Sequence, residues 1–191
     1  MTPPESVRER VLILCRAIPE DSKQYGTVVC VAGLTDKGEF RRLYPVLFRP
    51  FIERGAIPSR KKQWITATLE PSDSRDMRAE SRKIVMKSVI AGAKVDDAEV
   101  RRWIDPVLSK SVGDIQNNGA TLGIIRPFLL GYDFRITEDP SKPQQFKFDP
   151  EGHLAAGTKV RLGQESKYTF KCRDPASCTC AYRPHHMLIL D

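Results

Sequence analysis

Short apolar runs separated by turn signals recur along the chain, and they constrain its fold more than any other feature of the sequence. Val11–Cys15 is continuously apolar, Thr27–Gly33 is rich in β-branched residues, and Trp64–Leu69 alternates apolar and polar residues over most of its length. Runs of this length between loop residues are typical of β-strands. Similar runs continue to the C-terminus and give about nine or ten short strands, which predicts a mostly β protein of the barrel or sandwich type.

One segment between the strands carries the pattern of a helix. Asp96, with Glu99 three residues later, resembles a capping box at a helix start. Val100 and Trp103 then recur with neighbouring apolar residues at helical spacing, so one side of the helix is apolar. Pro106 is expected to end or kink this helix, because proline lacks the backbone donor that a helix interior uses.

The strand and helix signals divide the 191 residues into three parts. We expect an N-terminal β-barrel over residues 1–91, a helix with its connecting loop over 92–120, and a second β unit over 121–191. The predicted fold class is mostly β (α+β), with one intervening helix. A chain of this length can bury a sizeable core.

An excess of basic residues points to a polyanionic partner. The 31 lysines and arginines outnumber the 24 aspartates and glutamates, which gives a net charge of +7 and a pI of about 9.3. Nucleic acid is the commonest partner of such a protein, and a merely solvated basic surface is the alternative. No apolar run approaches the roughly 20 residues that cross a membrane, and the N-terminus lacks a signal-peptide pattern, so we expect no membrane partner.

A dense group of cysteines and histidines lies near the C-terminus. Three of the five cysteines and two of the three histidines fall within the fifteen residues from Cys172 to His186. Thiolate sulfur and imidazole nitrogen are preferred ligands of Zn²⁺, and a structural site takes four of them. We therefore predict a structural zinc site with Cys172, Cys178, Cys180 and His185 as ligands. An iron–sulfur cluster suits three local cysteines less well, and free thiols or a disulfide beside the histidines are the alternative without metal.

The other two cysteines, Cys15 and Cys30, lie inside predicted strands. We expect them to act as small buried hydrophobic residues. An odd cysteine count with three cysteines clustered suits metal binding better than a disulfide framework, which indicates a reducing, cytoplasmic compartment.

The first half of the chain contains three segments in an order known from another family. These segments are Leu12–Cys15, Val29–Gly33 and Gly38–Val46, and Arg78–Ser81 adds a later polar motif. The matching positions of the third segment are Gly38, Glu39, Phe40, Arg42, Pro45 and Val46. Over residues 11–85 the chain resembles the dual OB-containing domain family of prokaryotic defence and mobile-element systems. The resemblance implies one or two small OB-like β-barrels that bind nucleic acid, without an established catalytic site. The Cys/His cluster is not part of the family pattern.

Basic and aromatic residues interleave after Gly38, as binding of a single strand on a barrel requires. Such barrels combine a basic groove with exposed aromatic rings on which bases stack. Strand alternation places Phe40, Arg42 and Tyr44 on one face and Arg41 on the other. A role in the core is the competing interpretation for any single aromatic residue. The candidate nucleic-acid-binding residues are Phe40, Arg41, Arg42, Tyr44, Arg49, Arg60, Lys61 and Lys62.

Two further patterns leave alternatives open. A second basic run from Arg75 to Lys87 suits phosphate contacts and a solvated face equally well. Asp149 followed by Glu165 and Lys167 resembles a nuclease arrangement in which carboxylates hold Mg²⁺, although so short a pattern often occurs by chance. We predict a module or complex subunit that binds single-stranded DNA or RNA. A metal-dependent nuclease, or a subunit that docks an acidic protein partner, is the alternative.

Overall fold

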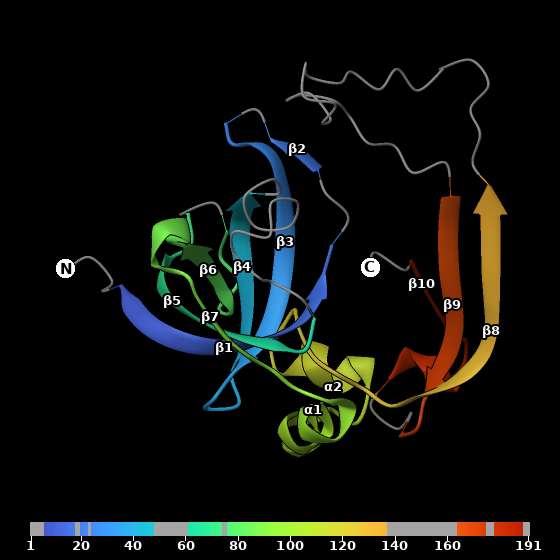
Figure 1. Ribbon diagram of the computed structural model, residues 1–191. Helices are drawn as coiled ribbons and strands as arrows, with labels where there is room; N and C mark the ends of the chain where they lie inside the picture. The colour runs from blue at the N-terminus through green and yellow to red at the C-terminus, as the bar shows by residue number, and fades with distance from the viewer. Residues whose placement is uncertain are drawn as a thin grey trace, which may run out of the picture.

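A barrel, a pair of helices below it and a separate small sheet make up the protein (Figure 1). The computed structural model describes residues 6–17, 20–22, 24–47, 61–73, 76–136, 164–174 and 178–188. Ten β-strands and two α-helices lie within these residues. The elements of the first half are β1 (Val7–Arg16), β2 (Glu20–Ser22), β3 (Gly26–Thr35), β4 (Phe40–Leu47), β5 (Gln63–Pro71), β6 (Ser81–Ile84) and β7 (Ile90–Lys94). Those of the second half are α1 (Asp97–Ile104), α2 (Val112–Asn117), β8 (Pro127–Ile136), β9 (Gln164–Cys172) and β10 (His185–Leu188).

Five strands close into a barrel in the order β1-β3-β4-β6-β5, because β5 pairs with β1 as well as with β6. The β4–β6 pair is parallel, and the other barrel pairs are antiparallel. The four strands β5-β1-β3-β4 lie in the Greek-key order, in which the fourth strand returns beside the first. β2 and β7 add to this sheet through β3 and β5. The structure confirms the predicted mostly β fold class with a small barrel.

The barrel core follows from alternation along its strands. Val11 and Ile13 of β1 are fully buried in the interior cluster, whereas Leu12 between them belongs to a second cluster outside the barrel. α1 covers that second cluster, and Trp103 of α1 contacts Trp64 of β5 edge to face, with ring centroids 5.0 Å apart. Each large side chain buried in this way stabilises the fold by about 1.5–3 kcal/mol.

The helix signals of the sequence correspond to real caps. The side chain of Asp96 accepts a hydrogen bond from the backbone N–H of Glu99 at 2.8 Å, which caps the start of α1. α1 ends at Ile104, and a 3₁₀ turn that contains Pro106 follows. Among the described residues no helix has the length and apolar character that a membrane span needs.

A buried ion pair links β1 to β4. Arg41 is 8% exposed, and its guanidinium donates to both carboxylate oxygens of Glu9, at 2.7 and 2.8 Å, and to Glu39. The hydrogen bond from Arg41 lowers the pKa of Glu9, although burial opposes this shift. A bidentate pair of this kind satisfies charges that would be costly to bury alone.

A folded-back segment connects α1 to the second sheet. Leu108 and Ile124 form a β-bridge that closes residues 108–124 into a loop, and this loop carries α2. Ser111 caps α2 by accepting from the N–H of Asp114 at 2.9 Å. Gly123 lies so close to Ile115 that a Cβ at Gly123 would fall 2.4 Å from the Ile115 side chain, so the loop is tightly packed against α2. β8, β9 and β10 then form a three-stranded antiparallel sheet.

Candidate functional site

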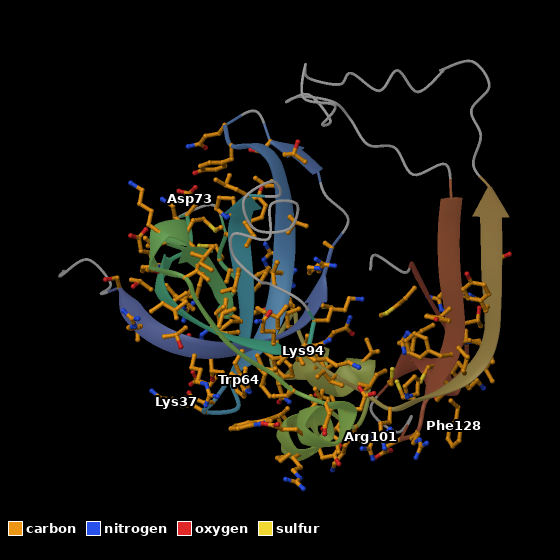
Figure 2. The ribbon with its side chains drawn as sticks, in the orientation of Figure 1. Lys37, Trp64, Asp73, Lys94, Arg101 and Phe128 are labelled. Atoms are coloured by element: carbon orange, nitrogen blue, oxygen red, sulfur yellow. The ribbon has the colours of Figure 1, made fainter. Side chains whose placement is uncertain are left out.

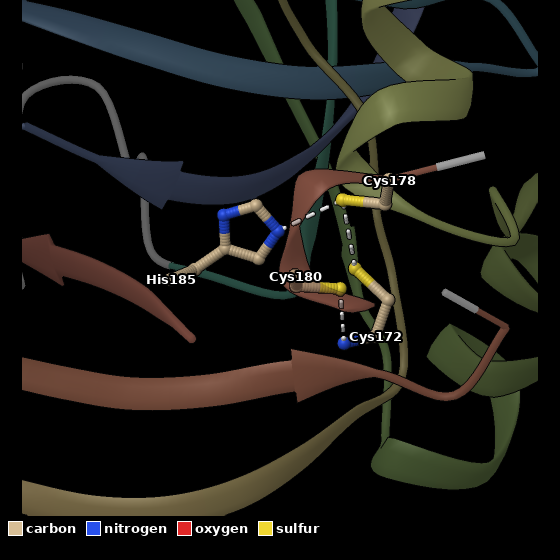
Figure 3. A group of neighbouring side chains, drawn as sticks. All are labelled: Cys172, Cys178, Cys180 and His185. Atoms are coloured by element: carbon tan, nitrogen blue, oxygen red, sulfur yellow. Dashed lines mark hydrogen bonds between the residues drawn. The ribbon is translucent and has the colours of Figure 1, made fainter. Parts of the chain in front are cut away.

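The structure brings together the four residues that the sequence predicts as metal ligands. One ligand atom from each of Cys172, Cys178, Cys180 and His185 lies within 4.8 Å of the others (Figure 3). The Sγ atoms of Cys172 and Cys178 are 3.9 Å apart, and His185 Nε2 lies 3.0 Å from Cys178 Sγ. All five cysteines of the chain are free thiols, so no disulfide competes with this arrangement.

Strand geometry places the ligands. Cys172 is the last residue of β9, Cys180 lies in a 3₁₀ turn at Thr179–Ala181, and His185 begins β10. Successive side chains of β9 alternate between two sides, so Tyr168, Phe170 and Cys172 share the side on which the cluster lies. His185 pairs with Phe170 in register, and the two rings contact each other with centroids 5.1 Å apart.

Hydrogen bonds to sulfur polarise the cluster. The backbone N–H of Val112, the first residue of α2, donates to Cys172 Sγ at 3.4 Å, and the N–H of Cys172 donates to Cys180 Sγ at 3.3 Å. Burial would raise the pKa of Cys178, but hydrogen bonds from the backbone of Cys180 and Gly113 and from His185 lower it to about 6. Burial raises the pKa of Cys172 to about 12. These opposite shifts favour a thiolate at Cys178 beside a protonated thiol at Cys172.

This donor set suits a metal ion. Four ligands at about 2.0–2.3 Å from a tetrahedral centre lie roughly 3.3–3.8 Å from one another. The observed separations of 3.0 and 3.9 Å lie on either side of this range, and all four ligand atoms lie within 4.8 Å of one another. Three thiols and one imidazole fill all four positions, which is the pattern of a structural site and leaves no open position for a reactant. The cluster is therefore able to hold a metal ion. Val112 and Ile125 pack on its three cysteines as partly buried apolar residues, and the buried ring of Phe170 contacts His185.

A groove of about 590 Å³ lies on the outer face of the barrel. It is formed by the turn before β3, the strands β3, β4 and β6, and the loop between β5 and β6. Two aromatic rings and four basic side chains are among its lining residues: Tyr25, Arg42, Tyr44, Arg78, Arg82 and Lys83. Asp73 and Asp76 also line it, but the four basic side chains outnumber these two carboxylates, so the groove has a net positive charge.

Hydrogen bonds hold two of the groove arginines in place. Arg78 makes a bidentate pair with Asp76 at 2.7 Å for both bonds, and this pair lowers the pKa of Asp76. Arg42 donates to the carbonyl oxygen of Thr121 at 3.4 Å and to its Oγ1 at 3.2 Å. The guanidinium of Arg42 also lies 3.9 Å from Cys30 Sγ. Thr121 follows α2, so the connecting segment holds a side chain that lines the groove.

Burial on β4 follows the alternation that the sequence predicts. Arg41 is buried, whereas Phe40, Arg42 and Tyr44 are half-buried on the outer face. Arg42 and Tyr44 line the groove. Arg41 is held inside by Glu9 and therefore is not available to a ligand in the groove.

The other predicted basic residues lie elsewhere. Lys61 and Lys62 do not line the groove, and Lys62 forms an ion pair with Asp97 of α1 at 2.5 Å. Arg49 and Arg60 lie outside the described residues. Of the second basic run, Arg78, Arg82 and Lys83 reach the groove instead.

The expectation that Cys15 and Cys30 are buried hydrophobic residues is wrong. Cys15 is exposed, because a register irregularity between Ile13 and Cys15 interrupts the alternation of β1. Cys30 is half-buried and lines the groove. The sequence does not predict Tyr25 as a groove residue either, because its position in a turn before Gly26 carries no signal for a groove.

The structure describes only part of the residue set of the nuclease alternative. Asp149 lies outside the described residues, and Glu165 and Lys167 lie in β9. Lys167 pairs in register with Asp133 of β8.

A closed five-stranded barrel followed by a Cys₃His cluster defines a β-barrel domain with an appended element able to hold a metal. The sequence model of one family, described as a domain of unknown function (DUF8758), matches residues 7–109, and the chain belongs to this family. The match spans the barrel and α1 and ends before the cluster. No curated protein and no solved structure matches the chain significantly.

Proposed function

We propose that this DUF8758 protein binds single-stranded nucleic acid in the groove on the outer face of its barrel. The observation that carries the proposal is the convergence of basic and aromatic side chains from separate segments. Tyr25 precedes β3, Arg42 and Tyr44 lie on β4, and Arg82 and Lys83 lie on β6. Cationic side chains that follow a phosphate backbone, beside rings on which bases stack, are what single-strand binding requires.

The topology supports the same function. An OB fold is a five-stranded Greek-key barrel that binds oligonucleotides with its second and third strands and with the loops after its first and fourth strands. Here β3 and β4 are the second and third barrel strands, and the groove extends over the turn before β3 and the loop between β5 and β6. This correspondence supports our proposal that the barrel is an OB fold. The resemblance to the dual OB-containing domain family agrees with this assignment and is the basis for proposing a role in prokaryotic defence.

The metal in the cluster is proposed to be zinc in a structural role. Zinc prefers thiolate and imidazole ligands in tetrahedral geometry, and such a site contributes directly to folding. Cys172, Cys178, Cys180 and His185 would hold it. A reducing cytoplasm suits this site, because thiols persist there. Elemental analysis of protein purified without chelators is expected to give about one zinc per chain. Protein that contains neither zinc nor iron would refute the site.

The binding proposal is tested with fluorescent single-stranded DNA and RNA of mixed sequence. We expect the affinity to fall as salt rises, because phosphate contacts release counterions. The double variant Arg82→Ala/Lys83→Ala should weaken binding and reduce the salt slope by about 0.7 for each phosphate that the protein no longer neutralises. The matched control is Arg101→Ala/Arg102→Ala on the exposed face of α1, which changes the net charge equally.

The two variants remove charge from opposite ends of the barrel. Figure 2 shows Asp73, a groove residue, at the opposite end of the barrel from Arg101. Binding that stays undetectable at low salt contradicts the proposal. Equal weakening by the groove variant and the control would show that only net charge matters, and that the groove is not the site.

A further inference from the structure

Thr121 links the groove to the connecting segment after α1 through four hydrogen bonds to Arg42 and Glu80. Its side-chain hydroxyl accepts from Arg42 at 3.2 Å and donates to the carboxylate of Glu80. Its backbone N–H donates to the same carboxylate at 3.2 Å, and its carbonyl accepts from Arg42 at 3.4 Å. Glu80 is itself 8% exposed, so this residue and Arg42 depend on Thr121 for a large part of their hydrogen bonding.

The segment that ends in Thr121 begins at the Cys₃His cluster. Val112 donates its N–H to Cys172 Sγ at 3.4 Å, and its side chain packs on the three cysteines together with Ile125. α2 then runs from Val112 to Asn117, and the left-handed Gly119, with φ of 69°, turns the chain toward Thr121. The N–H of Ala120 bonds back to the carbonyl of Ile115 at 3.1 Å, which fixes the turn against the helix. α2 and the hydrogen-bonded turn after it therefore connect the cluster to the guanidinium in the groove.

We propose that Thr121 is a positioning residue for Arg42, and that metal in the Cys₃His cluster sets the affinity of the groove through the segment from Val112 to Thr121. The inference rests on the proposed nucleic-acid binding, and it adds a dependence of that binding on the metal. The chemistry of the ligand is unchanged: the phosphate of a single strand meets Arg42 in the orientation that Thr121 fixes.

The affinity of the groove is expected to depend on the metal because the apolar core around the three cysteines is small. Only Val112 and Ile125, among the side chains that the structure describes, pack on the three cysteines as partly buried apolar residues. Where so little apolar surface is buried, binding of metal supplies much of the free energy that orders the region. Loss of the metal removes the fixed sulfur partner of Val112 and frees α2 to move. Arg42 then loses its preorganised orientation, and the ligand bears the cost of ordering it.

The test compares Thr121→Val with Thr121→Ser and uses Thr169→Val as a control. Valine keeps the shape of threonine but removes the hydroxyl, whereas serine keeps the hydroxyl. Thr169 lies on β9 with its hydroxyl 3.0 Å from His186 Nδ1, so the control loses a hydroxyl near the cluster without touching Arg42. The probe is a fluorescent single-stranded oligonucleotide, measured with zinc-loaded protein and again after chelation.

We expect Thr121→Val to weaken binding about three- to tenfold with unchanged zinc content, which is the usual effect of losing one hydrogen bond. Thr121→Ser and Thr169→Val should bind as the unaltered protein does. Chelation should weaken the unaltered protein by a similar factor and should weaken Thr121→Val by less, because that variant has already lost the link. Equal sensitivity of both proteins to chelation overturns the inference, as does wild-type affinity in zinc-loaded Thr121→Val.

A readout without nucleic acid separates this inference from the proposed function. Amide hydrogen exchange should become faster at Thr121 on chelation, while the core amides of Val29 and Val31 stay protected. Unchanged protection at Thr121 refutes the coupling even if the groove binds nucleic acid. Faster exchange at Thr121, with no oligonucleotide binding by zinc-loaded protein, keeps the link between cluster and groove but refutes its proposed ligand.

Discussion

Substitutions at Tyr44 and at its neighbour Leu43 distinguish an effect on binding in the groove from an effect on the stability of the barrel core. Leu43 is fully buried in the barrel interior, whereas Tyr44 is half-buried and lines the groove on the opposite face of β4. Leu43→Ala should therefore destabilise the protein by about 2–5 kcal/mol, as truncations in a core do. Its affinity per folded molecule should stay near that of the unaltered protein.

Tyr44→Ala should have the reverse profile. Removing one ring on which a base stacks costs about 1–3 kcal/mol of binding, which corresponds to roughly a 5- to 150-fold loss of affinity. Because the ring is half-buried, its truncation should cost about 1.5–2.5 kcal/mol of stability, around half the value of a fully buried aromatic residue. Tyr44→Phe keeps the ring and should bind within a factor of about two of the unaltered protein.

Both quantities are measured on the same preparations. Urea denaturation gives the free energy of unfolding, and fluorescence anisotropy with a labelled single strand at low salt gives the affinity. Wild-type affinity in Tyr44→Ala would refute base stacking at this position. A loss of stability as large as that of Leu43→Ala, with unchanged affinity, would show that the outer face of β4 serves the fold and not a ligand.

Three further predictions concern the fold and the cluster. Glu9→Gln should destabilise the protein by about 3 kcal/mol, because it leaves the buried Arg41 with fewer charge partners, and urea denaturation measures this loss. The pKa of Glu9 is lower in the folded state than in the unfolded chain, so its stabilisation is present above the unfolded pKa and is lost as the pH falls through the folded pKa; the stability of Glu9→Gln should change less over that range. Cys180→Ser should abolish zinc binding in elemental analysis, whereas Cys15→Ser, which alters an exposed thiol, should retain it. Gly33→Ala should lower the melting temperature, with a loss of about 1–3 kcal/mol, because the new Cβ would lie 2.5 Å from the backbone of β1.

The sequence predicts the features that depend on neighbouring residues. Alternation in β4 correctly separates Arg41 from Arg42, and the capping pattern correctly starts the helix at Asp96. The four candidate ligands are predictable as a group because three of them fall within nine residues of one another, and the reversal after β9 brings His185 back beside Phe170. Local spacing and local chemistry are enough in each case.

The groove is not predictable as a unit, because its residues meet only after the barrel closes. The parallel pairing of β4 with β6 brings Arg82 beside Leu43, and no sequence pattern encodes this pairing over such a separation. The sequence does not predict α2, because six residues are too short for a helical period to emerge. The prediction for Cys15 is wrong because one register irregularity reverses the face of a strand.

Because the side chains of β9 alternate between its two faces, insertions and deletions in this strand would displace the cluster residues. Phe170 and Cys172 lie on the side of the cluster, and Thr169 and Lys171 lie on the other. Inserting or deleting one residue between Phe170 and Cys172 would turn the sulfur to the opposite side, and inserting two would move it about 7 Å along the strand. Related chains that keep the cluster should therefore conserve this two-residue spacing even where the residue between them varies freely.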